Sequence, residues 1–132
     1  MERLFKIIWI ILRYILALFM IFGGLQHFLK TTFYIPFVPS FLPYKIYIIY
    51  ISGIIEIVLG VMLLLNKEYA KFGALGVFIL MLLFLPIHIA DIFSVNPAIG
   101  THKAALIRLP IQFLLVGLAY KIYHNLAQKN TH

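Results

Sequence analysis

The sequence predicts an all-α protein, a four-helix transmembrane bundle that forms a single domain over residues 1–132. Of its 132 residues, 64% are hydrophobic and only 11% are charged, and the mean hydropathy is +1.04. The hydrophobic fraction and the mean hydropathy lie far above those of ordinary soluble domains, and the charged fraction lies far below. Four continuous apolar runs are each long enough to cross a bilayer as a helix, at about 20 residues per span. No separate soluble domain fits in the remainder.

The first apolar run, residues 5–29, is predicted to be a retained helix rather than a cleaved signal peptide. Its apolar part is longer than the roughly 7–15 residues of a signal h-region, and no A-x-A-like cleavage site follows it. Arg13 also interrupts the run. Residues 31–44, TTFYIPFVPSFLPY, contain prolines that disfavour a regular helix and aromatic rings that favour the membrane interface. We expect this short segment to cap the outer end of the bundle.

The other three helices are expected over residues 45–66, 70–91 and 104–124. The connection NKEY is so short that the helices on either side of it must be antiparallel neighbours. Residues 92–103 are polar and rich in turn-forming residues, which indicates a loop.

Lysine and arginine are unequally distributed over the two ends of the predicted bundle. The end with both termini holds Arg3, Lys6, Lys67, Lys71, Lys121 and Lys129, whereas the other end holds Lys30, Lys45 and Lys103. The positive-inside rule therefore places both termini in the cytoplasm, and we expect a prokaryotic plasma (inner) membrane. The basic residues behind the net charge of +7 are scattered without a patch, which favours a lipid bilayer over nucleic acid as the partner.

Helical spacing places the polar side chains of each run on one face. In the second run, Gly53, Glu56 and Gly60 share a stripe of small residues that lets a neighbouring helix approach closely. The polar residues expected inside the bundle are, in chain order, Arg13, His27, Glu56, His88, Asp91, Arg108 and Gln112. At about 1.5 Å per residue they collect in the outer half, except for Arg13, which lies toward the cytoplasm.

Glu56 lies near the expected bilayer centre, where a carboxylate needs a specific reason to exist. One hypothesis is a buried ion pair or hydrogen bond with Arg13, Arg108 or Gln112 that fixes helix packing. The other is a catalytic role, in which Glu56 and His27 exchange protons with a lipophilic ligand. Both hypotheses stay open at this point.

Arg108 and Gln112 lie one turn apart, so a guanidinium and an amide can bind two oxygens of a quinone, a carboxylate or a lipid headgroup. Alternatively, Arg108 snorkels to the interface and Gln112 bonds a neighbouring helix. Asp91 is a candidate to neutralise Arg108 or Lys103. With His88 and Arg13, these residues form the expected ligand-binding set.

No metal site is predicted. The chain has no cysteine, which excludes thiolate ligands, thiol–disulfide exchange and covalent haem attachment. His27 and His88 lie at similar depth and could ligate a b-type haem. No further haem signature accompanies them, so hydrogen-bonded roles at the rim of a pocket are favoured.

Five short motifs together resemble the DoxX-like family of small four-helix membrane proteins. They are GGLQHF, IPFVPSFLP, YISGIIEIVLGVMLLL, LPIH and RLPIQ, in that order between about Arg13 and Leu118. In many relatives the position of His88 carries asparagine. The resemblance implies the four-helix fold. It also implies a link to membrane oxidoreductases that pass electrons to quinone, since some members serve there as small subunits, whereas others accompany membrane complexes or act in assembly.

Two functions are therefore expected. The first is a quinone- or lipophile-binding subunit of a membrane oxidoreductase system, with its site in the outer half of the bundle and electrons supplied by a partner redox subunit. The second is a non-catalytic accessory or assembly subunit of a larger complex, in which the same polar groups hold the helices together. Transport is less favoured, because paired half-helices are absent from the sequence pattern.

Overall fold

The computed structural model describes residues 1–129, which are helical and contain no strand. The elements are α1 (Glu2–Leu29), α2 (Thr31–Tyr34), the 3₁₀ helix η1 (Ile35–Phe37), α3 (Lys45–Leu64), α4 (Lys67–Phe93) and α5 (His102–Lys129). Four of them, α1, α3, α4 and α5, are long and apolar enough to cross a membrane. The predicted fold class is confirmed.

Local sequence explains where the elements begin and end. The helix α4 starts at Lys67, before the expected residue 70, because the Asn66 side chain accepts a hydrogen bond from the Tyr69 amide at 3.2 Å and caps the helix. After α1, the chain makes the single turn α2 and then η1, with Pro36 in the first turn of η1, where a missing N–H costs nothing. Tyr44, with φ of 58°, then turns the chain into α3.

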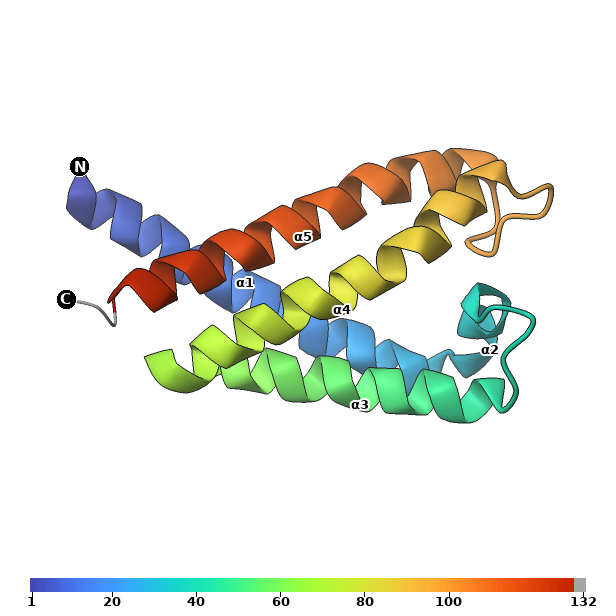
Figure 1. Ribbon diagram of the computed structural model, residues 1–132, viewed down its shortest axis with the longest axis horizontal. Coiled ribbons are helices and arrows are strands. Elements are labelled where there is room, and N and C mark those ends of the chain that lie inside the picture. The colour runs from blue at the N-terminus through green and yellow to red at the C-terminus, as the bar shows by residue number, and fades with distance from the viewer. Residues whose placement is uncertain (130–132) are drawn as a thin grey trace.

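The long helices pack as two pairs that are joined by contacts between α3 and α4. Helix α1 packs along α3, α4 packs along α5, and α3 contacts α4 (Figure 1). The start of α1, the end of α5 and the connection between α3 and α4 lie at one end, while α2 and the loop before α5 lie at the other (Figure 1). We call these the terminal end and the loop end.

Glycines bring α1 and α3 into close contact. A Cβ added to Gly53 would lie 2.8 Å from the His27 Cβ and 2.9 Å from the Gly24 carbonyl oxygen. A Cβ added to Gly60 would lie 2.8 Å from the Ala17 carbonyl oxygen. The stripe predicted in the second apolar run therefore faces α1, and its small residues set the distance between the two backbones.

The outward faces of the long helices carry large apolar side chains. Leu18, Phe22, Leu83 and Leu114 are all more than half exposed, at 61%, 63%, 66% and 67%. Residues such as Leu16, Met20, Leu63 and Val77 form the buried centre. This distribution fits a bundle whose outer surface lies against lipid rather than water.

The close contact of α1 with α3 predicts opposite effects of alanine at two glycines. Gly53→Ala should lower the free energy of unfolding by about 1–3 kcal/mol, because the new methyl group has no space. Gly117→Ala is the matched control, since nothing lies within 4 Å of its added Cβ, and it should be neutral or stabilising by roughly 0.5–1 kcal/mol. Thermal unfolding in detergent measures both, and equal behaviour of the two variants would contradict the packing described.

Candidate functional site

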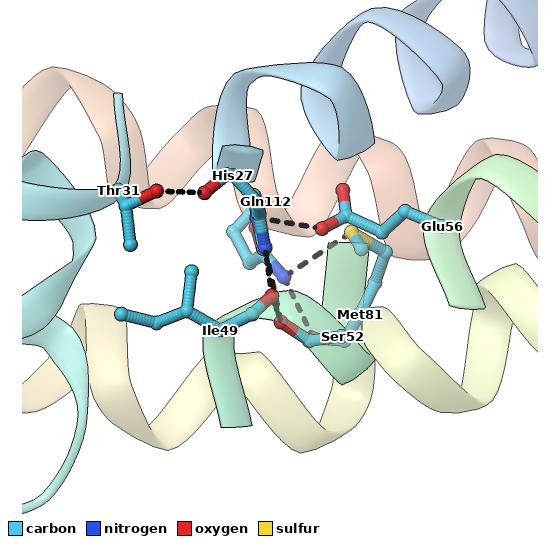
Figure 2. Close-up of polar contacts among 7 residues, drawn as sticks. All are labelled: His27, Thr31, Ile49, Ser52, Glu56, Met81 and Gln112. Atoms are coloured by element: carbon cyan, nitrogen blue, oxygen red, sulfur yellow. Dashed lines mark hydrogen bonds and ion pairs between the residues drawn. The ribbon is translucent and has the colours of Figure 1, made fainter. Parts of the chain in front are cut away.

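A buried histidine and a buried glutamate face one another between α1 and α3 at the loop end (Figure 2). His27 lies in the last turn of α1 and Glu56 in the middle of α3, and the residues are 7% and 6% exposed. The His27 Nε2 lies 2.8 Å from the Glu56 Oε2. Of the groups expected to pair with Glu56, neither arginine nor Gln112 takes this place. The sequence placed His27 beside Glu56 only as a second proton carrier.

The surroundings of His27 fix the hydrogen on its Nδ1. Its Nδ1 lies 2.9 Å from the Ile49 carbonyl oxygen and 3.0 Å from the Ser52 Oγ, which itself donates to the same carbonyl at 2.9 Å. A carbonyl can only accept, so Nδ1 carries a hydrogen and donates it. The 2.8 Å contact between Nε2 and the Glu56 Oε2 requires a proton between them, carried by the nitrogen or by the oxygen.

Tyr34 of α2 covers this pair, with its ring centroid 4.3 Å from that of His27. Burial and the Glu56 carboxylate raise the pKa of Tyr34, and the Arg108 guanidinium opposes that rise. The phenol therefore stays protonated at neutral pH and can donate a hydrogen bond. These effects also show that Tyr34 lies within electrostatic range of both Glu56 and Arg108.

Arg108 on α5 brings a positive charge to the same region. It lies within electrostatic range of Glu56 and Tyr34, and also of His88 on α4. Its Nη1 is buried and has no hydrogen-bond partner among the described residues. The ring of His88 lies against Phe37, with centroids 6.0 Å apart. The structure thus places His27, Glu56, His88 and Arg108 within contact or electrostatic range of one another.

Gln112 joins α4 to α5. It is completely buried, and its Nε2 donates to the Met81 carbonyl oxygen at 2.7 Å (Figure 2). Its Oε1 is buried and accepts no hydrogen bond from the described residues. The residue therefore clamps two helices with its amide nitrogen and keeps a vacant acceptor.

Asp91 and Arg13 have different surroundings from the pair of His27 and Glu56, although Asp91 lies within electrostatic range of His88. The Asp91 carboxylate accepts from the backbone amides of Ala98 at 2.5 Å and Ile99 at 3.3 Å, so it anchors the loop between α4 and α5. The sequence instead suggested a charge partner in Arg108 or Lys103. Arg13 lines a hollow with Lys67 and Asn125, at the terminal end.

The geometry does not fit a b-type haem held by His27 and His88. Both ring nitrogens of His27 are engaged, one by the Ile49 carbonyl and one by Glu56. Neither is left to ligate iron without breaking one of these contacts.

Sequence reasoning missed Tyr34 and Ser52 as members of the site. Ser52 precedes Glu56 by one helical turn on the same face, so the i, i+4 rule could have identified it. Tyr34 lies in the proline-containing segment, whose fold over His27 leaves no periodic signal in the sequence.

Residues 16–123 match the model of a family described as a domain of unknown function, DUF8561. Because this match covers most of the chain, the protein belongs to that family. The matched range includes every residue of the cluster from His27 to Gln112. Searches among curated proteins and among solved structures find no match.

The role of Asp91 as a loop anchor predicts a local loss of stability. Asp91→Ala should cost about 1–3 kcal/mol of unfolding free energy, because two backbone amides lose their acceptor. Asp91→Asn keeps one carbonyl oxygen and should cost less. Hydrogen exchange at Ala98 and Ile99 in micelles should speed up in the same order. Unchanged exchange in Asp91→Ala would show that the carboxylate has another task.

Proposed function

We propose that the polar cluster at the loop end binds the oxygen-bearing head of a lipophilic compound, of which a quinone is the best fit. The observation that carries the proposal is a buried, proton-sharing pair, His27 and Glu56, within electrostatic range of an arginine whose Nη1 has no partner. Buried ionisable groups of this kind mark functional sites in membrane proteins. The resemblance to DoxX-like proteins supports the same class of ligand.

In this proposal each residue has a distinct task. The Arg108 Nη1 donates to one ligand oxygen, and the Tyr34 phenol is a second donor. The vacant Oε1 of Gln112 accepts from a hydroxyl of the ligand. His27 and Glu56 hold the one mobile proton and can give it up or take it back. Electrons come from a partner redox subunit of a membrane oxidoreductase system.

A route from the lipid to this cluster is supported by a hollow beside Tyr34. It measures about 310 Å³ and is lined by Phe22, Gln26, Lys30, Phe33 and Tyr34. The aromatic rings that line the hollow suit an apolar ring system. The Tyr34 ring also packs against the His27 ring, so it lies between the hollow and the buried pair. A flat lipophile could therefore approach between α1 and α2 and meet the phenol first.

We further propose that both termini face the cytoplasm of a prokaryotic cell. The terminal end carries more lysine and arginine than the loop end, which is the bias of cytoplasmic flanks. The polar cluster then lies in the outer half of the membrane.

A second candidate function is a non-catalytic accessory or assembly subunit, and specific contacts favour it. The contact of His27 with Glu56 joins α1 to α3, and the bond from Gln112 to the Met81 carbonyl joins α4 to α5. Polar contacts between membrane helices can exist for packing alone. Here the cluster fixes the bundle, and function lies in a partner protein.

Mass spectrometry of compounds that co-purify in mild detergent tests the first proposal. We expect the wild-type protein to retain a lipophile at a fixed molar ratio to protein. In Glu56→Gln and Arg108→Ala this ratio should fall at least tenfold. Glu56→Gln is suited to the test because its amide can still donate to the His27 Nε2 while the mobile proton is lost. Lys103→Ala, an exposed change at the same end, is the control and should retain the compound.

Unfolding temperature separates the two functions. If Glu56→Gln retains stability and loses the compound, a ligand site is supported. If the folded wild type is empty and the variants fail to fold or to assemble with a membrane complex, the accessory function is favoured and the ligand proposal is wrong.

A further inference from the structure

A groove at the terminal end is built differently from the polar cluster. It measures about 720 Å³ and lies between the first half of α1, the end of α5 and the connection of α3 with α4. One part of its wall is apolar, with Ile10, Leu65, Ile122 and Leu126. The other part carries basic side chains. A surface of this composition suits an amphipathic molecule.

Three basic side chains line the groove: Lys6, Arg13 and Lys67. Lys6 and Arg13 lie on the same face of α1, two turns or about 10 Å apart along the helix. No acidic residue is among the described residues that line this groove. The positive charge is therefore uncompensated within the groove and complements an anion.

Two buried hydrogen-bond donors in the groove have no acceptor. The Trp9 Nε1 and the Arg13 Nε are both buried, and neither has a hydrogen-bond partner among the described residues. They lie one turn apart on the face of α1 that lines the groove. A buried donor without an acceptor costs about 1–3 kcal/mol, so a ligand whose oxygens accept from these donors is favoured here.

We propose that this groove binds the headgroup of an anionic phospholipid. Phosphate and ester oxygens accept from Trp9 and Arg13, Lys6 and Lys67 neutralise the phosphate charge, and an acyl chain follows the apolar wall. A lipid is favoured over a soluble anion because the groove is bordered by Leu65, Ile122 and other apolar residues at the end of membrane-crossing helices. A zwitterionic lipid would leave the basic charge uncompensated.

The only tryptophan of the chain, Trp9, lies in this groove and makes the proposal directly measurable. The full-length protein is reconstituted in vesicles that contain 20% dibrominated phosphatidylglycerol in phosphatidylcholine. A second set contains 20% dibrominated phosphatidylcholine in phosphatidylglycerol. Bromine quenches tryptophan only at close range. Because both brominated lipids make up 20% of their bilayers, we expect quenching by the brominated anionic lipid to be at least threefold stronger.

Paired variants test which charges create the preference. Lys6→Gln with Lys67→Gln should abolish the preference for phosphatidylglycerol, and Arg13→Gln should weaken it. Lys45→Gln with Lys103→Gln removes the same charge at the loop end and should leave it intact. Helical circular dichroism and unfolding temperature identify any variant that fails to fold, and the lysine pair keeps the test valid if Arg13→Gln is such a variant.

Three results would overturn the proposal. The first is equal quenching by the two brominated lipids in the wild type. The second is a preference that survives in Lys6→Gln with Lys67→Gln. The third is relief of quenching by millimolar inorganic phosphate but not by chloride at equal ionic strength, which would assign the groove to a soluble phosphate compound.

Discussion

The contact between α1 and α3 is the constraint on which the rest of the loop end depends. Gly53 and Gly24 bring the two backbones together, and this places the His27 Nε2 2.8 Å from the Glu56 Oε2. A proton can be shared between Nε2 and a carboxylate only at such a distance, and only a dry site keeps competing water away. The glycines therefore set both the packing of α1 against α3 and the contact between His27 and Glu56. A substitution that separates the two helices would also separate these two side chains.

The two helix pairs are held together by different kinds of polar contact. Between α4 and α5 a neutral amide, Gln112, donates to a backbone carbonyl, so this particular contact buries no charge. Between α1 and α3 the contact is ionisable. Arg108 on α5 lies within electrostatic range of Glu56 on α3. This interaction links the two helix pairs at the loop end.

The sequence predicts the fold well because helix length and apolarity are local properties. The stripe of Gly53, Glu56 and Gly60 likewise predicts which face of α3 meets a neighbour. Spacing gives a face and a depth, but it does not give the rotation of one helix about another. For that reason the sequence predicts Arg13, Arg108 or Gln112 as the partner of Glu56, whereas the structure shows His27 in that position. Tyr34 was missed because α2 folds over His27 through tertiary contacts.

The two ends of the bundle pose opposite electrostatic problems, and they admit opposite solutions. At the loop end, the buried acid Glu56 contacts the base His27 directly, and the Arg108 Nη1 is left without a hydrogen-bond partner among the described residues. At the terminal end, Lys6, Arg13 and Lys67 line a groove with no acid among its described lining residues, which complements an anion. Because α1 and α5 flank that groove, an anionic lipid bound there would tie the two helix pairs together at the terminal end. Relative movement of the pairs would then be confined to the loop end, where Arg108 approaches Glu56 and where a ligand would have to enter.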